Sequence, residues 1–464
     1  MKKTLLFAAA VLALAACSKE SPVKVEGTID VSKLVFNIDV QNGNATKGVK
    51  TAWENGDDVY VFFEDNTTQY VKMTYDGTSW SYADKDGGTT FAGLTLEASG
   101  KKVSAVYFPD FVLGSNTFFY DGSSWTLDVV WSGYFQKANG VEYTVTTTSN
   151  VTTLNTTLTL TAPARISQIF IPDSEVPAPA SGNEYVLTAT HLIQTGFAYA
   201  YAGGDVIQSN GGIGHPLTGY YGTLGGQTGY YFWGILDGGA GTYDFDFQLV
   251  ERNAEKEYAI SSKSKSITGK TVPASFAAKL TGLTDNGNFV SLGFGDCLWA
   301  TGNLDKTNSK IVDPLEAGEY FMYGKTTPYN SSDAIYTGEE TPLSTDHDAA
   351  YQANNAWCIP THEQLDALIS SSYTLSEWVS NWTSIGSTKG GWLITSKKNG
   401  ISVFFVAAGL YNGSLLGAGD EGYYWSSNSF SEVGADYLYF DYSGIKTDLG
   451  ISREFGFPIR PVKN

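Results

Sequence analysis

Several residue types are scarce in this 464-residue chain, and each scarcity excludes a class of function. Only three cysteines are present, too few for a disulfide framework or for a zinc site with four thiolate ligands. Arginine occurs only at positions 165, 252, 453 and 460. Lysine and arginine together number 29 against 48 aspartates and glutamates, a formal net charge of -19. A surface of this sign repels phosphate backbones, so nucleic acid is excluded as a partner.

The residues that are abundant favour strands and turns. Hydrophobic residues make up 42% of the chain and aromatic residues 14%, which is enough to build cores and excludes wholesale disorder. Glycine alone contributes 51 residues, and threonine, serine, asparagine and tyrosine are frequent. These types favour strands and turns over helices. The length fits about three domains of ordinary size, so we expect a mainly β chain of three domains.

The N-terminus has the features of an export signal. Two lysines precede an apolar run at residues 5–13, which is too short to span a bilayer. The sequence Leu-Ala-Ala then leads to Cys17, a pattern that resembles a bacterial lipobox. The resemblance implies a signal peptide at residues 1–16, an acylated Cys17 held by outer-membrane lipid, and a polar tether at residues 17–24. The alternative is an ordinary secretory signal in which the cysteine has no role.

A first β-domain is predicted for residues 25–150. Ile38 and Val40 alternate with polar residues, as in a strand with one buried face. The segments YDGTSW at 75–80 and YDGSSW at 120–125 share one hairpin pattern. Asp-Gly at each apex suits a type I′ turn, and the flanking aromatic residues are placed to pair across the two strands.

Two segments of this domain resemble the N-terminal domain of Bacteroidetes fimbrillins: TAWENGDDVYVFF at 51–63 and VSAVYFP at 103–109. Fimbrillins are lipoprotein precursors of pilus subunits, built from two transthyretin-like β-sandwich domains. The resemblance implies a surface location, in a fimbrium once assembled, and other pilus subunits as partners through donor-strand insertion. In that family an arginine-specific protease removes the first strand. Lys50 stands where the arginine is usual, so a cut after Lys47 or Lys50, or no cut, is expected instead.

A second β-sandwich domain is predicted for residues 151–285. Segments 156–160 and 166–171 have strand character, and prolines break the chain before the next strand. Two aromatic clusters follow, GYY at 219–221 and GYYFW at 229–233. Packing in a sheet core is the first interpretation of these clusters, and a platform that stacks on sugar rings is the alternative.

Residues 286–464 are predicted to form an α+β module. Thr361 and Gln364 have the spacing of a capping box, and Leu365, Leu368 and Ile369 then form one apolar helical face. Short aromatic segments separated by glycine- and serine-bearing turns complete the module.

The motifs of this module resemble the Fibrobacter succinogenes major paralogous domain. They occur in the family's order and spacing. The segments are LWATGNL, YFMYGKTTP, WCIPTHEQLDAL, VFFVAAGLYNG, GYYWSSNSF, YLYF and FGFPIRPV. The resemblance implies a C-type-lectin-like fold and display at the cell surface more than a reaction.

A ligand-contact surface is expected on the loops and strands of residues 411–436, where tyrosine and tryptophan offer flat faces with little rotamer entropy to lose. The alternative is that these rings fill the core of the module. The expected contact residues are Tyr411, Asn412, Asp420, Tyr423, Trp425, Asn428 and Asp436. No metal site or cofactor is predicted. Calcium is kept as an alternative because lectin-like folds bind it through acidic side chains.

These features predict an adhesin and no enzyme. We expect a lipid-anchored protein of the outer membrane, at the tip or in an accessory position of a fimbrillin-type pilus, that contacts a glycan or protein on a host or bacterial surface. Residues 455–461 match the end of a closed module and supply no donor strand, which favours an end position. An unpolymerised lipoprotein that captures glycan or protein is the second hypothesis, and a glycan-processing enzyme the third. Cys297 and Cys358 are either a disulfide or two buried thiols.

Overall fold

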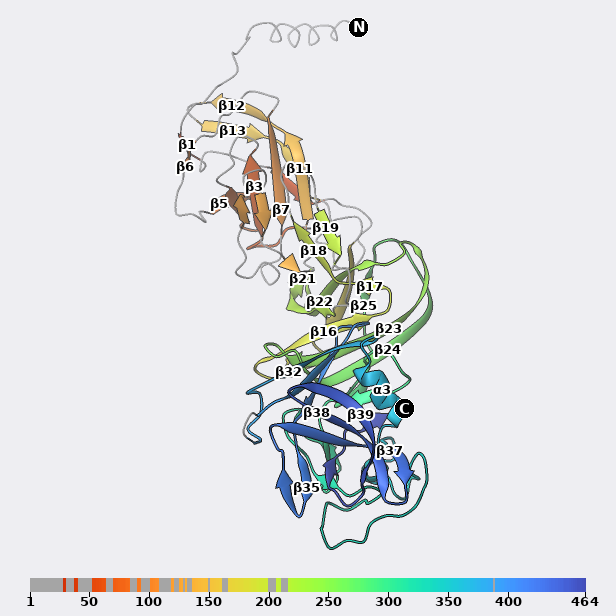
Figure 1. Cartoon of the computed structure of the whole chain (residues 1–464). Helices are drawn as coiled ribbons and strands as arrows, with labels where there is room; N and C mark the ends of the chain where they lie inside the picture. The colour runs from red at the N-terminus through yellow and green to blue at the C-terminus, as the bar shows by residue number, and fades with distance from the viewer. Residues whose placement is uncertain are drawn as a thin grey trace, which may run out of the picture.

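The computed structural model describes residues 28–30, 37–40, 52–63, 70–83, 90–92, 101–107, 118–120, 125–127, 130–131, 136–148, 151–160, 166–198, 206–209, 216–386 and 389–464. Three strand-rich regions follow one another from the N-terminal to the far end of the molecule (Figure 1). The predicted signal peptide and tether at 1–24, with Cys17, lie outside the described residues, as do Lys47 and Lys50. Within the described residues no helix has the length and apolar character needed to cross a bilayer.

The first region is built on a five-stranded antiparallel sheet. Its strand order is β11 (Gln136–Glu142), β7 (Lys102–Tyr107), β3 (Asp58–Phe63), β4 (Val71–Tyr75), β5 (Trp80–Ala83). Every residue of β3 is buried, because this strand is central and both of its faces are covered. The strand-forming sequence DVYVFF therefore reads as a continuous apolar run instead of an alternating one.

Short strand pairs surround this sheet. They are β1 (Thr28–Asp30) with β6 (Thr90–Ala92), β8 (Phe118–Tyr120) with β9 (Trp125–Leu127), β12 (Thr144–Thr148) with β13 (Val151–Asn155), and β2 (Asn37–Val40) with β14 (Thr157–Leu160). The pairing of β2 and β14 is parallel and buries Ile38, Leu158 and Leu160 in one core. Strand pairing thus carries the first region past residue 150, to the end of β14.

The hairpin of β4 and β5 shows the predicted aromatic pair. Tyr75 lies opposite Trp80, with ring centroids 5.3 Å apart. The turn differs from the predicted two-residue type I′ turn, because four residues, 76–79, lie between the paired strands. The Asp76 carboxylate accepts hydrogen bonds from the backbone N–H groups of Thr78 (2.8 Å) and Ser79 (2.7 Å), and these lower its pKa to about 2. The side chain of Asp76 thus stabilises a longer turn than the Asp-Gly pair suggests.

The second region is a sandwich of two sheets. One sheet has the order β17 (Leu192–Ile193), β22 (Gln227–Leu236), β15 (Ile166–Pro172), β25 (Ala277–Lys279), with β21 (Tyr220–Leu224) also paired to β22. The other has the order β20 (Leu217–Thr218), β16 (Asn183–Ala189), β23 (Gly241–Asn253), β24 (Ala259–Val272), β26 (Thr284–Gly287). A small sheet of β10 (Val130–Trp131), β18 (Thr195–Ala198) and β19 (Val206–Ser209) joins the first two regions.

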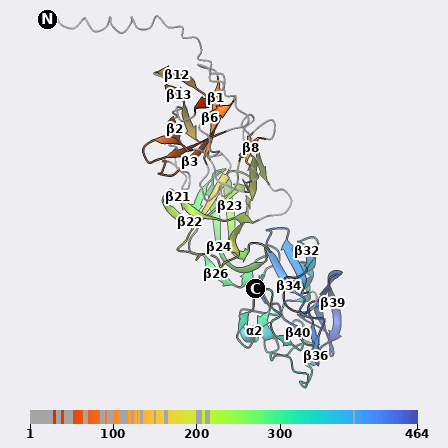
Figure 2. The ribbon, with the colours of Figure 1, turned by 90° about the vertical axis from the view of Figure 1, so that its left-hand side faces the viewer.

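Both sheets of the sandwich are covered on their outer faces as well. Along β22, Tyr230 and Phe232 point into the sandwich core, whereas Tyr231 and Trp233 point into the core of the first region. On the opposite sheet, Val186 pairs with Val250, and both belong to a core shared with the terminal region. The three regions therefore pack against one another through shared cores and follow one another along an elongated molecule (Figure 2).

The terminal region contains several small antiparallel sheets. The three-stranded ones are β27 (Phe289–Val290), β28 (Leu298–Ala300), β41 (Val462–Lys463); β32 (Thr374–Val379), β33 (Gly391–Ser396), β34 (Ser402–Val406); and β37 (Glu421–Ser431), β38 (Gly434–Asp441), β39 (Gly444–Ser452). The two-stranded ones are β29 (Leu304–Asp305) with β30 (Lys310–Ile311), β31 (Tyr320–Phe321) with β40 (Phe457–Pro458), and β35 (Leu410–Asn412) with β36 (Ser414–Leu416).

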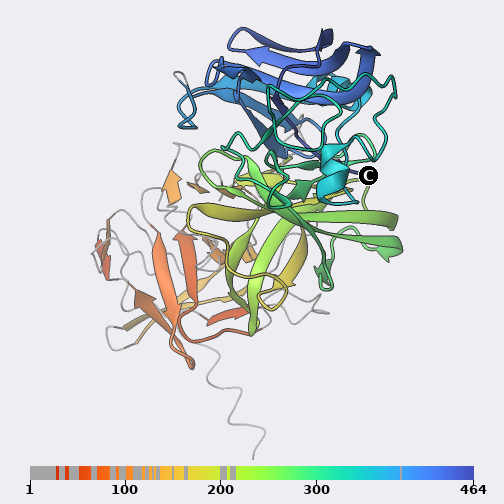
Figure 3. The ribbon, with the colours of Figure 1, turned by 90° about the horizontal axis from the view of Figure 1, so that it is seen from below.

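Two short helices complete the terminal region, α2 (Ala349–Ala353) and α3 (His362–Ile369). The predicted helix start is confirmed: the Thr361 side chain accepts from the backbone of Gln364, and the Gln364 side chain accepts from the backbone of Thr361. Leu365 and Leu368 are fully buried against the sheets, as the spacing predicts. A helix alongside small sheets gives the α+β character expected of this region, while its lectin-like identity stays a prediction (Figure 3).

Candidate functional site

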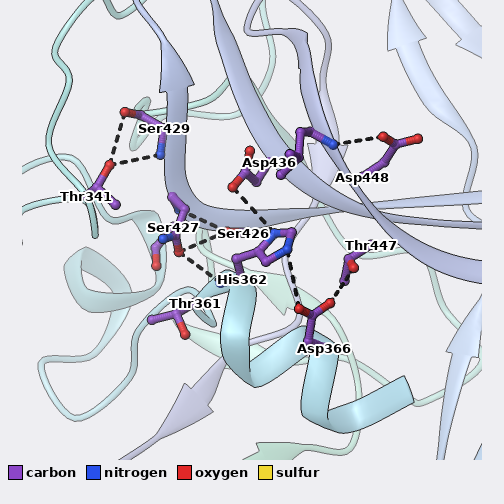
Figure 4. Close-up of polar contacts among 12 residues, drawn as sticks. Thr341, Thr361, His362, Asp366, Ser426, Ser427, Ser429, Asp436, Thr447 and Asp448 are labelled. Carbon is purple, nitrogen blue, oxygen red and sulfur yellow. Dashed lines mark hydrogen bonds and ion pairs between the residues drawn. The ribbon is translucent and has the colours of Figure 1, made fainter. Parts of the chain in front are cut away.

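The most polar part of the terminal core lies where α3 meets β37 and β38. His362, the first residue of α3, is held between two carboxylates (Figure 4). Its Nδ1 lies 3.4 Å from Oδ2 of Asp436, and its Nε2 lies 3.5 Å from Oδ2 of Asp366. The amide oxygen of Asn428 accepts a hydrogen bond from the backbone N–H of His362 at 2.8 Å. We call His362, Asp366, Ser427, Asn428 and Asp436 the His362 cluster.

Three side-chain atoms of the described residues are buried without a hydrogen-bond partner, and all belong to this cluster. They are Nδ1 of His362, Oγ of Ser427 and Oδ1 of Asp436. Burial raises the pKa of Asp436, and the neighbouring His362 opposes that rise. Because native cores satisfy nearly all buried polar groups, unmet capacity concentrated in one place is unusual. The buried polar atoms of the described residues that lack a hydrogen-bond partner are therefore concentrated in the His362 cluster, where they are expected to destabilise the fold.

The geometry of the cluster limits what chemistry it can perform. Ser427 is only 2% exposed, so its hydroxyl is not open to a substrate. A glycosidase needs two carboxylates that face each other across a sugar ring. Between Asp436 and Asp366 lies the imidazole of His362, so no sugar can occupy that space. The cluster does not have the arrangement that glycoside hydrolysis requires.

The expected contact residues do not form one surface. Trp425 is 1% exposed, its ring stacks on Phe457 with centroids 4.1 Å apart, and its indole N–H donates to the carbonyl of Phe321 at 2.7 Å. Asp436 is likewise buried, in the His362 cluster. These two side chains are part of the core and not of a contact surface, because the closed module covers both faces of β37 and β38.

The other expected contact residues lie nearer the surface. Asn412 is exposed at the turn between β35 and β36, and Tyr411 is half-buried beside Tyr320, with ring centroids 4.9 Å apart. Tyr423 is half-buried, and its hydroxyl donates to Oε2 of Glu421 at 2.9 Å. Asp420 is half-buried between β36 and β37, and Asn428 is half-buried in the His362 cluster. Only Asn412 therefore projects freely into solvent among the seven predicted residues.

The exposed apolar side chains form a pattern that the sequence did not reveal. Of nine large hydrophobic residues that are exposed among the described residues, all but Tyr221 belong to the terminal region. These eight are Tyr373, Leu375, Leu415, Leu416, Phe430, Val433, Tyr442 and Leu449. Phe430 and Val433, both about 60% exposed, flank the tight turn between β37 and β38, and the Phe430 ring lies over Gly450 of β39. We call Phe430, Val433 and Leu449 the apolar tip.

Acidic residues of the region do not assemble into a metal site. No group of three or more histidine, cysteine, aspartate or glutamate side chains in the described ranges is placed to hold a metal ion. Asp348 illustrates the reason, because its carboxylate accepts from the backbone N–H groups of Ala350, Tyr351 and Ile359 at 2.8, 3.1 and 2.9 Å. This carboxylate caps α2 and anchors the segment before α3, so its oxygens are already occupied.

Comparison with known proteins gives only distant similarity. No family model matches the chain, and no curated protein matches it significantly. Solved structures of similar architecture are those of adhesion and fimbrial proteins of Bacteroides and Porphyromonas.

Three solved structures illustrate this distance. A proposed cell adhesion protein of Bacteroides fragilis shares 10% identity at a TM-score of 0.25, covering 58% of this chain and 99% of that protein. A fimbrial protein of Bacteroides ovatus shares 10% identity at a TM-score of 0.21, and the match covers 95% of this chain and 100% of that protein. The fimbrial anchor protein Mfa2 of Porphyromonas gingivalis shares 12% identity at a TM-score of 0.23, and the match covers 55% of this chain and 96% of that protein. With identities and TM-scores this low, none of them assigns a function.

Proposed function

We propose that this protein is a surface-anchored adhesin whose terminal region contacts the ligand. One observation carries the proposal: eight of the nine large, exposed hydrophobic side chains among the described residues lie in that region. Three of them, Phe430, Val433 and Leu449, lie together at one end of the sheet of β37, β38 and β39, and apolar side chains exposed together mark interaction surfaces. The terminal region is also at the end of the elongated molecule opposite the N-terminal region, so it would reach furthest from an acylated Cys17 (Figure 1).

The packing between the regions suits this role. Gln248 of β23 donates through Nε2 to the carbonyl of Ser291 at 3.0 Å, and its Oε1 accepts from the backbone N–H of the same residue. The hydroxyl of Thr301 donates to the carbonyl of Ile260 at 2.9 Å. Together with the shared apolar core, these bonds hold the terminal region on the sandwich as a rigid head, so little ordering entropy is lost when it meets a surface.

We further propose an end position in a fimbrillin-type pilus, at the tip or as an accessory subunit. Donor-strand assembly needs a strand that can leave its own subunit. The strand β41, from the segment where fimbrillins carry their donor, is paired with β28 and contributes Val462 to the terminal core. Its release would expose that core, which disfavours donation. An unpolymerised surface lipoprotein that captures glycan or protein remains the second hypothesis, and gold-labelled antibody at fibre ends or on bare membrane separates the two.

The contact role is tested with the apolar tip. The double variant Phe430→Ala/Val433→Ala should lower adhesion of bacteria carrying the full chain to mucin-coated plastic about tenfold or more, since apolar anchors at an interface each contribute roughly 1–2 kcal/mol. Its melting temperature should stay within about 2 °C of wild type because both side chains are largely exposed.

Lys270→Ala is the control, since Lys270 is an exposed residue of β24 in the second region and lies outside the apolar tip. It should leave adhesion unchanged. Full adhesion by the double variant, or an equal loss in the Lys270 variant, would refute the terminal region as the contact surface.

A further inference from the structure

An open groove of about 420 Å³ lies on the second region, away from the terminal region. The loop of residues 173–179 forms one side, the start of β16 lies beneath it, and β21 and β22 form the other side. Its volume is within the range of small-ligand sites, which begins at roughly 300 Å³. Among the described residues outside the terminal region, Tyr221 is the one large hydrophobic side chain that is exposed, and it is part of the lining of this groove.

Tyrosine rings dominate one wall of the groove. The ring of Tyr230 contacts Tyr185 on one side and Tyr221 on the other, with both centroid distances at 5.0 Å. Tyr185 and Tyr230 are buried, whereas Tyr221 is about half exposed. The three rings pack against one another and leave no space between them. The Tyr230 plane is inclined by 80° to Tyr185 and by 52° to Tyr221, so the half-exposed ring of Tyr221 is the one that is open for stacking, and the packed rings form no cage of the kind that encloses a cation.

The groove also offers tyrosine hydroxyls and a carboxylate. The hydroxyls of Tyr185, Tyr221 and Tyr230 donate to no other described residue, and Asp173 makes no ion pair or hydrogen bond within the described chain. Burial, with nearby Glu251, raises the pKa of Tyr185 to about 12, so this hydroxyl remains a donor at any physiological pH. No lysine or arginine lines the groove. The lining offers hydrogen bonds to hydroxyl groups and repels anions.

The groove is already formed without a ligand. Oε1 of Glu251 accepts from the backbone N–H of Ala180 at 3.1 Å and from the Asn183 amide at 2.8 Å, which fixes one end of the loop. At the other end, Oε2 of Glu175 accepts from the backbone N–H of Gly282 at 2.9 Å. Pro177 and Pro179 stiffen the segment between these anchors. A ligand would therefore enter without first ordering the loop.

Gly219 keeps the groove floor open. A Cβ atom at this position would lie 2.6 Å from the carbonyl oxygen of Tyr185 and 2.8 Å from the ring of Phe232. The absence of a side chain lets the start of β21 approach β16 closely enough to bring the tyrosines of the two sheets together. The backbone N–H of Gly219 donates to the carbonyl of Tyr185, which is 34 residues earlier in the chain. The arrangement of the groove thus depends on tertiary contacts.

We infer that this groove binds a neutral saccharide of two or three rings, which stacks on Tyr221 and gives hydroxyl hydrogen bonds to Asp173. The inference does not rest on the adhesin proposal, because the groove and the apolar tip lie on different regions. It favours neutral sugars over acidic ones because the lining carries carboxylates and no cation. It favours sugars over amines because the open face of Tyr221 can stack on a sugar ring, whereas the closely packed tyrosines form no cage for a cation.

The test is calorimetric titration of the full chain in detergent with maltotriose, cellotriose, mannotriose and N,N′-diacetylchitobiose. Sialyllactose serves as the acidic probe and N-acetyl-lysine amide as the cationic one. We expect at least one neutral sugar to bind with a dissociation constant of about 1 mM or tighter, and both charged probes to bind at least about tenfold more weakly.

Tyr221→Ala and Asp173→Asn should each weaken that sugar about tenfold, with unchanged melting temperatures because both residues lie at the surface. Tyr442→Ala removes a tyrosine of the terminal region that is even more exposed, and it should leave the affinity unchanged. Failure of all four sugars to bind at about 10 mM would overturn the inference. So would stronger binding of the lysine amide, or sugar binding that survives both groove variants. Loss of mucin adhesion in the apolar-tip variant has no bearing on these outcomes.

Discussion

Replacing Arg460 with methionine should destabilise the terminal region by about 4 kcal/mol. Arg460 is fully buried and has no carboxylate partner among the described residues. Its guanidinium donates to Oδ1 of Asn303 at 3.0 Å and to the carbonyls of Ala300 and Phe404 at 3.2 and 2.7 Å. Burial lowers the pKa of Arg460 to about 10, and the neighbouring Tyr424 opposes that fall.

The magnitude follows from the acceptors that the substitution leaves behind. Each buried acceptor without a donor costs roughly 1–3 kcal/mol, so three of them amount to about 6 kcal/mol. Methionine returns part of this, since it has no charge to desolvate and fills most of the volume. Two of the three acceptors are backbone carbonyls, which no compensating substitution can remove. The expected net loss is therefore about 4 kcal/mol, the cost of three unpaired acceptors less what methionine returns.

The assay is urea unfolding at pH 7, followed by tryptophan fluorescence and by hydrogen exchange of residues 298–304 and 402–406. At a slope of about 3 kcal/mol/M, the midpoint of the terminal region should fall by more than about 1 M. Arg252→Met is the matched control. Arg252 pairs with Glu184 at 2.7 Å and with the exposed Glu257 at 3.3 Å, so its loss should cost about 1 kcal/mol or less. The reasoning fails if Arg460→Met unfolds with wild type, or if the Arg252 variant loses as much stability.

Four further outcomes are expected. The pKa of Asp436 is raised in the folded state, so its contribution to stability is present at low pH and is lost as pH rises through that pKa. The free energy of unfolding of Asp436→Asn, relative to that of wild type, should therefore increase between about pH 4 and pH 7 in paired urea titrations. A difference that does not change with pH would contradict this. Cys297 and Cys358 are free thiols whose pKa burial raises to about 11, so intact-mass measurement should show alkylation of both only after unfolding, and a mass two hydrogens lower before reduction would reveal a disulfide. Thr361→Ala should lower the free energy of unfolding by about 1 kcal/mol through loss of the α3 cap, whereas Thr361→Ser should restore most of it. Calcium or a chelator should leave the melting temperature within about 1 °C, and a larger rise with calcium would indicate a site formed by residues outside the described set.

Local sequence was sufficient for features that depend on near neighbours. The capping box at Thr361 and the burial of Leu365 and Leu368 follow from spacing along one helix. The pairing of Tyr75 with Trp80 follows from a strand, a turn and a second strand. Ile38 is buried as its alternation predicts. The mainly β architecture was likewise evident from composition, because glycine, threonine and aromatic residues suit strands and turns.

Placement of the predicted contact residues could not be derived in this way. Trp425 and Asn412 each carry a polar group, yet Trp425, within β37, is in the core, whereas Asn412, at the turn between β35 and β36, is in solvent. The face of β37 that carries Trp425 is covered by Phe321 and Phe457, each more than 30 residues away along the chain. Side-chain period in a strand says that two faces differ, but not which of them meets another layer.

The sequence by itself determined the strand-rich character, the cap of α3 and the acidic character of this protein, since these depend on composition or on residues within a few positions of one another. Tertiary structure alone decided that both faces of β22 are covered. Its Tyr230 and Phe232 are buried in the sandwich core, and its Tyr231 and Trp233 are buried in the core of the first region. It also placed Arg460 in a cage of carbonyls and brought Tyr185 and Tyr221 to one groove. Long-range packing selects among the many sheet arrangements that the same local pattern permits, because burial depends on which segments meet.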